Sequence, residues 1–216
     1  MKKFLIVILL FSGLCLKAQP VLKGGLESFI SSNIIYPAFS YQNCIQGTIR
    51  ISFKINKLGE VYSSKVSSGL GVDLDLEALR LIRMTSGKWK VTADYDTAYV
   101  LIVPVNFKLS SPDCNRIGQA EMNKAIAVYQ ANEGLTDAIV NFYRNKEAGK
   151  YDEQEEGRIL ALKKELGYDD AFLEQKIKEG QKKLQQKDRQ GACEDFLFVK
   201  HMGSALADDL LKKYCK

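Results

Sequence analysis

The stretch "QNCIQGTIRISFKINKLGEVYS", residues 42–63, decides the fold class, because apolar side chains fall at every second position. The alternating apolar residues are Ile49, Ile51, Phe53 and Ile55. A period of two is typical of a strand that buries one face. The "NKLG" segment that follows favours a turn, in which Gly59 permits a backbone conformation that other residues adopt rarely. We therefore predict two adjacent strands, over residues 47–56 and 60–67.

Two short helices and a third strand are predicted around this pair of strands. Residues 26–35 have apolar side chains at helical spacing, and Pro37 ends this helix because proline disfavours a helical residue before it. The second helix covers 74–84, with Asp73 or Asp75 at its N-terminal end. Its expected buried face consists of Leu76, Leu79, Ile82 and Arg83. The third strand covers 99–109, with one face formed by Leu101, Val103, Val105, Phe107 and Leu109.

Pro104 lies inside the third strand and restricts its place in the sheet. Proline has no backbone N–H, so it occurs at sheet edges, at strand starts and at bulges. The third strand should therefore have one unpaired side. Two interpretations stay open: the proline protects this edge from aggregation, or the edge docks another extended chain.

The N-terminus has the pattern of a secretory signal peptide. Lys2 and Lys3 precede an apolar run over 4–16, which is shorter than the roughly 20 residues that a membrane span needs. Ala18 is a suitable small residue before a cleavage site. We predict a signal peptide over residues 1–18 and a periplasmic or secreted mature protein, with a lipid anchor on Cys15 or a retained membrane anchor as alternatives.

The charge of the mature chain argues against a nucleic-acid partner. The whole chain has a formal charge of +5, and removal of residues 1–18 takes away three lysines and no acid, which leaves +2. A nucleic-acid binder would carry a basic face or stripe. We expect no nucleic-acid partner, and no small-molecule substrate is evident.

Four cysteines remain after removal of the signal: Cys44, Cys114, Cys193 and Cys215. An even number in an exported protein indicates disulfides, and four cysteines allow three pairings. We favour Cys44–Cys114 and Cys193–Cys215, because the second pair lies within one proposed domain and the first joins Cys44 to the boundary at the end of its own domain. The chain has one histidine and no CxxC motif, so no metal site and no cofactor is expected.

An ordered set of short motifs resembles the C-terminal domain of TonB-type energy transducers. The motifs are "YP" (36–37), "IQGTIRISFKINKLGEV" (45–61), "SSGLGVDLDLEALRLI" (67–82), "KWKV" (88–91) and "VPVNFKL" (103–109). This resemblance implies an α+β fold over 21–110, in which two helices pack on a small antiparallel three-stranded sheet. The positions expected to have structural roles in it are Tyr36, Pro37, Gly47, Gly59, Trp89 and Pro104.

The resemblance also implies a protein-binding edge. In that family the domain binds an extended segment of an outer-membrane receptor by adding it to the sheet, so that backbone hydrogen bonds provide the affinity. The matching edge here is the third strand. Its partner-binding candidates are Tyr99, Val100, Leu101, Ile102, Val103, Val105 and Phe107.

Two departures from the family pattern keep other functions open. A transducer needs a retained membrane helix and a long proline-rich linker, whereas only Pro20 and Pro37 precede the first sheet strand. The chain also continues for about 100 residues beyond the domain. The alternatives are a membrane-anchored transducer that serves transmembrane transport, and a structural envelope protein whose sheet edge is capped by its own tail or by a second copy in a homodimer.

The C-terminal part, residues 114–216, is expected to be an all-α domain. Helices are predicted over 117–131 and 135–144, with a break near Gly134. A hairpin near 171–215 resembles a tetratricopeptide-type repeat, because Gly180, Ala192 and Phe196 match that motif in spacing. Only one such unit is present, and Lys183 stands where an aromatic residue is usual.

No catalytic residue is predicted. Cys193 and His201 are eight residues apart and would lie about 12 Å apart along one helix, too far for a nucleophile and its base. The chain also shows no glycine-rich phosphate loop and no convergent set of acid, base and nucleophile. We therefore expect a non-enzymatic protein of the cell envelope.

Overall fold

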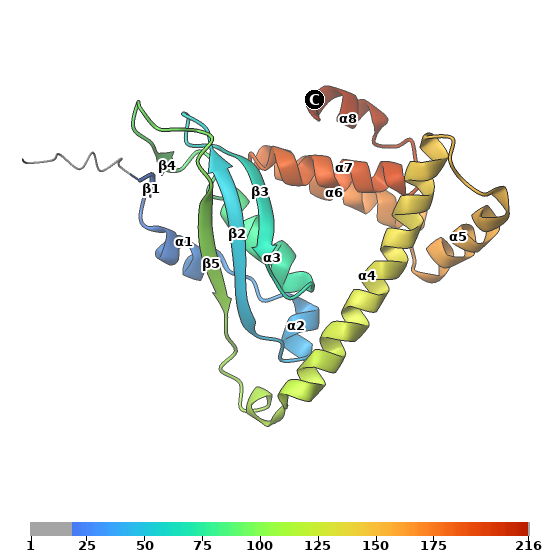
Figure 1. Ribbon diagram of the computed structural model, residues 1–216, viewed down its shortest axis with the longest axis horizontal. Helices are drawn as coiled ribbons and strands as arrows, with labels where there is room; N and C mark the ends of the chain where they lie inside the picture. The colour runs from blue at the N-terminus through green and yellow to red at the C-terminus, as the bar shows by residue number, and fades with distance from the viewer. Residues whose placement is uncertain (1–18, 216) are drawn as a thin grey trace, which may run out of the picture.

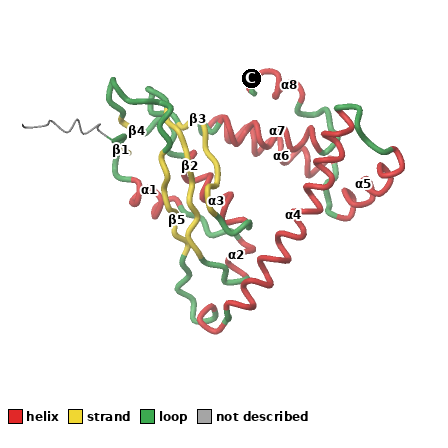
Figure 2. The backbone as a smooth tube through the Cα atoms, viewed as in Figure 1, coloured by secondary structure: helices red, strands yellow, loops and turns green. Residues whose placement is uncertain are grey.

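The computed structural model describes residues 19–215, and the predicted signal peptide with Cys15 lies outside the described residues. Figures 1 and 2 show a sheet with helices on one side of the molecule and a helical arm on the other. The elements, in chain order, are β1 (Val21–Leu22), α1 (Leu26–Asn33), α2 (Ala38–Gln42), β2 (Gly47–Ile55), β3 (Val61–Ser68), α3 (Asp73–Arg83), β4 (Trp89–Lys90), β5 (Leu101–Phe107), the 3-10 turn η1 (Cys114–Arg116), α4 (Gln119–Glu147), α5 (Glu153–Glu165), α6 (Asp170–Gln185), α7 (Arg189–His201) and α8 (Asp208–Tyr214).

The main sheet is antiparallel, with the strand order β3-β2-β5. The predicted α+β fold with a small three-stranded sheet is therefore confirmed. A separate two-stranded pair of β1 and β4 was not predicted. The third strand is shorter than expected, because Tyr99 closes a turn by donating its backbone N–H to the carbonyl of Asp96 at 3.1 Å, and pairing begins only at Leu101.

The alternating residues of β2 form the centre of the first hydrophobic core. Ile49, Ile51, Phe53 and Ile55 are all buried beneath α1 and α3. Trp89 packs against Phe53 and donates its indole N–H to Thr85 Oγ1 at 2.7 Å. Gly59 has a φ of 77°, and a Cβ there would lie 2.2 Å from the Trp89 carbonyl oxygen, so both the turn and the close backbone approach require glycine.

The expected buried face of α3 was partly wrong. Leu79, Ile82 and Arg83 are buried, but 65% of the Leu76 surface is exposed. The helix turns its Leu74, Ala78, Leu81 side toward the sheet instead, so Leu76 lies on the opposite side.

The predicted break at Gly134 was also wrong, because α4 is continuous through it. No atom lies within 4 Å of a Cβ built on Gly134, so this glycine does not mark a close contact. The two halves of α4 are held by different cores: Ala125, Ile126 and Tyr129 pack on the first, and Ile139 lies in the second. This tertiary packing outweighs the cost of roughly 1 kcal/mol for one glycine in a helix.

The second core lies in the helical part. α6 and α7 form an antiparallel hairpin in which Gly180 faces Phe196 so closely that a Cβ on Gly180 would lie 2.5 Å from the ring. Gly180, Ala192 and Phe196 are all buried. A hairpin is therefore present where the sequence predicted one, and its likeness to a tetratricopeptide repeat stays a prediction, as does the division of the chain at 110–114.

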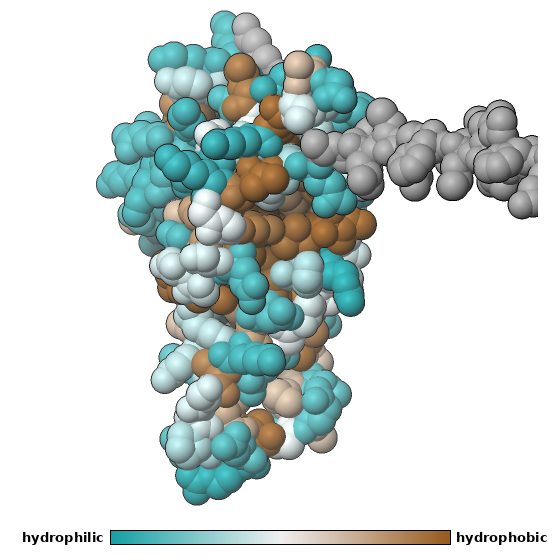
Figure 3. All heavy atoms as spheres, turned by 90° about the vertical axis from the view of Figure 1, so that its left-hand side faces the viewer, coloured by the Kyte–Doolittle hydropathy of each residue, from teal (hydrophilic) through white to brown (hydrophobic). Residues whose placement is uncertain are grey.

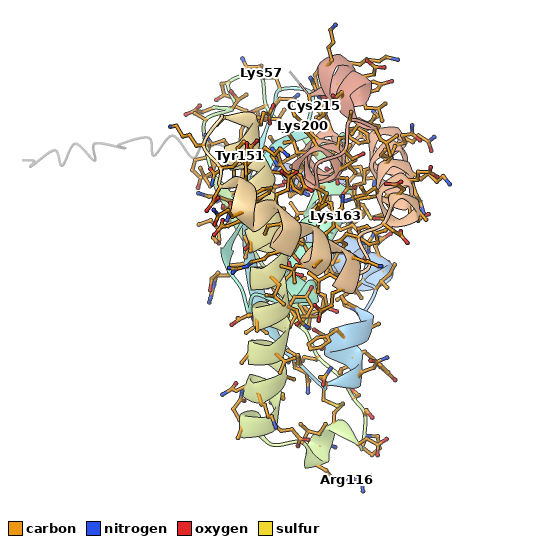
Figure 4. All side chains as sticks on the ribbon, turned by 90° about the vertical axis from the view of Figure 1, so that its right-hand side faces the viewer. Lys57, Arg116, Tyr151, Lys163, Lys200 and Cys215 are labelled. Atoms are coloured by element: carbon orange, nitrogen blue, oxygen red, sulfur yellow. A yellow bond between two sulfur atoms is a disulfide. The ribbon has the colours of Figure 1, made fainter. Side chains whose placement is uncertain are left out.

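Polar contacts join the helices of this part. Lys200 on α7 pairs with Glu147 on α4 at 2.7 Å, and Lys163 on α5 donates to the Met202 carbonyl at 2.7 Å. Figure 4 shows Lys163 and Lys200 in the upper part of the molecule, whereas Arg116 lies at the opposite tip, just before α4 begins. Within residues 19–215, no helix combines the length and the hydropathy that a membrane span requires.

Both favoured disulfides are present. Cys44–Cys114 joins the end of α2 to η1 over a separation of 70 residues, so it fixes the start of α4 beside the sheet. Cys193–Cys215 joins α7 to the residue that follows α8, over 22 residues. Arg189 assists this second closure by donating from Nε to the Tyr214 carbonyl at 2.5 Å.

We expect the longer loop to give the larger stabilisation. On the chain-entropy model, replacing Cys44 and Cys114 by serine lowers the free energy of unfolding by about 4 kcal/mol, and replacing Cys193 and Cys215 lowers it by about 3 kcal/mol. Denaturant unfolding of both double variants and of the wild type measures these values. A loss below about 1 kcal/mol for the first pair would contradict this account of the start of α4.

Candidate functional site

The sheet has two outer edges, and the helical part covers only one of them. β2 is the central strand, so β3 and β5 each have one side that faces away from it. β3 lies beside α7, and β5 lies on the far side of the sheet from α7 (Figure 1).

At the edge of β3, a side-chain amide pairs with the backbone of one residue, Ser64, as a neighbouring strand would. Gln190 on α7 accepts the backbone N–H of Ser64 at 2.7 Å and donates to the Ser64 carbonyl at 2.7 Å. Beside it, the buried Arg83 donates from Nε to Ser64 Oγ at 2.8 Å and holds Glu194 of α7 through two hydrogen bonds of 2.7 and 2.8 Å. The sequence did not reveal this contact, because Ser64 and Gln190 are 126 residues apart.

The same hydrogen bonds fix which backbone groups of β5 are free. Because both backbone groups of Ser64 face Gln190, those of its partner Phe53 must face the other way, toward β5. Phe53 stands opposite Leu101, so Leu101 points its backbone groups at β2 and Ile102 points its own outward. Alternation then directs the backbone of Pro104 and Asn106 outward as well.

Proline at position 104 therefore costs the sheet no hydrogen bond, because the backbone nitrogen of this residue points to the unpaired side of β5, away from β2. The outward groups of this edge are the N–H and C=O of Ile102 and Asn106 and the C=O of Pro104. Among residues 19–215, no further strand pairs with this side of β5. The prediction of an unpaired edge at Pro104 is confirmed.

The partner-binding candidates divide into two groups by side-chain direction. Val105 and Phe107 are buried, and Leu101 and Val103 are half-buried against the core, so these four could offer an added strand little beyond the backbone. Ile102, Tyr99 and Val100 are 61%, 52% and 45% exposed. Figure 3 shows hydrophobic residues gathered on the face that carries β5.

Three further predicted positions, Tyr36, Pro37 and Gly47, lie at or beside the start of β2. Tyr36 donates its hydroxyl to the Ile45 carbonyl at 2.6 Å and packs edge-on against Phe107. Burial, together with the nearby Asp73 carboxylate, raises the pKa of Tyr36 to about 12. Pro37 is the residue before α2, and a Cβ on Gly47 would press on Leu70 at 3.0 Å.

Cys193 and His201 do not form a nucleophile–base pair. Cys193 is held in its disulfide, and His201 ends α7 with its pKa lowered by burial and by Arg144. Among residues 19–215, no group of three or more metal-ligating side chains is present.

Residues 32–109 match the family model for the C-terminal domain of Gram-negative bacterial TonB protein. This match covers α2, the main sheet, α3 and all five motifs that carry the resemblance in the sequence. No curated protein and no solved structure matches the chain. The TonB-like character of this part is thus supported by the family match, by the order of its motifs and by its fold, and the helical part lies outside the matched range.

The two edges should differ in hydrogen exchange. The backbone N–H groups of Ile102 and Asn106 should exchange rapidly, whereas those of Leu101, Val103, Val105 and Phe107 should be protected by β2. The Ser64 N–H should be protected in the wild type and should lose that protection in Gln190→Ala. Amide exchange followed by NMR measures each site, and protection at Ile102 in the isolated monomer would contradict the assignment of a free edge.

Proposed function

We propose that this chain is an exported, non-enzymatic protein-binding module of the cell envelope that recognises an extended partner segment by strand addition at β5. The observation that carries the proposal is the asymmetry of the sheet: Gln190 covers the β3 edge, whereas the outward backbone groups of Ile102, Pro104 and Asn106 have no strand partner among the described residues. The match of residues 32–109 to the TonB C-terminal family supports a protein partner in the envelope.

Strand addition would proceed through the backbone, with side chains providing selectivity. An added strand would receive hydrogen bonds from the N–H groups of Ile102 and Asn106, and Pro104 would leave a gap between them. Its alternate side chains would lie beside exposed Ile102 on one face and beside half-buried Leu101 and Val103 on the other. This geometry suits a partner with apolar residues at alternating positions.

The substitution Ile102→Pro tests this mechanism. It removes an outward N–H without removing a hydrogen bond to β2, so the domain should stay folded while partner binding weakens at least tenfold. Ile102→Thr, which keeps the N–H, is the matched control and should bind nearly as the wild type does. The probes are synthetic peptides that copy the N-terminal segments of outer-membrane receptors from the same cell, and calorimetry measures their affinity.

Two results would contradict strand addition at β5. Wild-type affinity in a folded Ile102→Pro variant would exclude strand addition at this edge. A partner that binds only when Gln190→Ala exposes β3 would place the docking edge on the other side of the sheet.

The family match also supports a second function, that of a membrane-anchored transducer for receptor-dependent transport. The two functions differ in the fate of the N-terminus. The intact mass of the protein from its native envelope should correspond to a chain that begins at Gln19, as expected for a released binder. A full-length mass would favour the transducer, and a lipid mass on Cys15 would indicate a tethered binder.

A structural role, with a second copy on the β5 edge, is the third candidate. In a variant of this role, the chain covers its own sheet edge. The bonds of Gln190 to Ser64 support this for β3, whereas no such contact supports it for β5 among the described residues. Sedimentation equilibrium distinguishes it, because a homodimer through β5 should dissociate in Ile102→Pro.

A further inference from the structure

A cleft of about 540 Å³ lies between the sheet-bearing part and the helical part of the molecule. Its walls are α3, α4 and the α6–α7 hairpin. This volume is in the range of known ligand pockets, and such pockets occur preferentially where domains meet. Strand addition at β5 makes no use of the cleft, because β5 lies on the other side of the sheet.

One wall of the cleft is aromatic. Tyr168, Phe172 and Phe198 form a mutually packed trio whose ring centroids are 5.0 to 6.3 Å apart. Phe172 is 37% exposed, and the Tyr168 hydroxyl lies 2.8 Å from Thr136 Oγ1 on α4. Leu76 on α3 adds an exposed apolar side chain to the lining of the same cleft. Exposed apolar surface is therefore present on both walls of the cleft, at Leu76 on α3 and at Phe172 on α6.

The cations of the cleft are already engaged. Arg80 pairs with Glu77, Arg83 pairs with Glu194, and Lys176 and Lys183 both pair with Asp195. Lys176 also donates to Glu179. An anionic ligand would therefore have to displace existing ion pairs, so the cleft is poorly suited to phosphate or carboxylate groups.

The carboxylate of Glu133 is the exception among these paired charges. Glu133 lines the cleft from α4, and no hydrogen bond or ion pair to it is found within residues 19–215. Burial and the neighbouring Asp137 raise its pKa, against the opposing effect of Lys176. The lining contains six carboxylates and four cations in all, which leaves an excess of negative charge.

We propose that this cleft binds a lysine or arginine side chain of a polypeptide segment, with Glu133 as the anionic partner and the Tyr168, Phe172, Phe198 trio as the aromatic wall. A cation beside an aromatic face gains quadrupole attraction, and a carboxylate within reach adds a charged hydrogen bond. The source is a polypeptide rather than a small amine, because Leu76 and Phe172 offer apolar contacts for the residues that flank the cation.

Titration of the mature chain with the blocked peptide acetyl-Leu-Lys-Leu-Lys-Leu-amide tests the proposal. NMR should show shifts confined to α3, α4, α6 and α7, and calorimetry should give an affinity at least tenfold above that of acetyl-Leu-Glu-Leu-Glu-Leu-amide. Equal affinity for the two peptides would overturn the proposal. Butylammonium alone should bind far more weakly, and an affinity equal to that of the lysine peptide would overturn the polypeptide assignment.

Substitutions on α4 provide a matched pair. Glu133→Gln keeps the size of the side chain and should weaken the lysine peptide roughly tenfold, whereas Glu121→Gln, an exposed carboxylate in the first turn of the same helix, should change nothing. Phe172→Ala should weaken binding while thermal unfolding verifies that the chain stays folded. Wild-type affinity in Glu133→Gln would exclude Glu133 as the anionic partner.

Binding of the lysine peptide in the cleft should be independent of strand addition at β5. Ile102→Pro should leave lysine-peptide binding unchanged, because it alters only the β5 edge. If Ile102→Pro abolished peptide binding and Glu133→Gln did not, the peptide would be binding at the sheet edge, and the cleft proposal would be wrong.

Discussion

The buried guanidinium of Arg83 is the constraint on which the rest of the arrangement depends. A buried charge is costly unless it is paired and hydrogen-bonded, and Arg83 meets this requirement by bonding Ser64 on β3 and Glu194 on α7, with Asp188 Oδ1 a further 3.9 Å from its Nε. Satisfying this one group thus places α7 beside the sheet. The position of α7 then brings Gln190 onto the backbone of Ser64 and closes that edge.

The consequences extend to both candidate sites. Because Gln190 occupies the backbone groups of Ser64 on β3, β5 is the outer strand left for strand addition, and Pro104 limits its pairing without weakening its bonds to β2. The cleft that contains Glu133 and the aromatic trio lies between α3, α4 and the same α6–α7 hairpin.

The helical part therefore contributes hydrogen bonds to the edge of the sheet. The side-chain amide of Gln190 on α7 takes the place of a neighbouring strand at one residue of the β3 edge, where it bonds both backbone groups of Ser64. The two disulfides support this geometry at separate places, since Cys44–Cys114 fixes where α4 begins and Cys193–Cys215 closes the end of the chain onto α7.

The sequence by itself determined the features that rest on local patterns. The alternation from Ile49 to Ile55 predicted the central strand, Gly59 the turn, Pro104 the unpaired edge, and the ordered motifs the α+β fold. It misjudged Gly134, because a helix tolerates glycine when both of its halves are packed, and Leu76, because spacing alone does not say which helix face meets the sheet. Only the tertiary structure decided that α7 lies beside β3 and that Glu133 lines the same cleft as Tyr168, Phe172 and Phe198. Both features bring together residues that lie far apart in the chain, and the contact of α7 with β3 depends on the pairing of the buried Arg83 rather than on any local period.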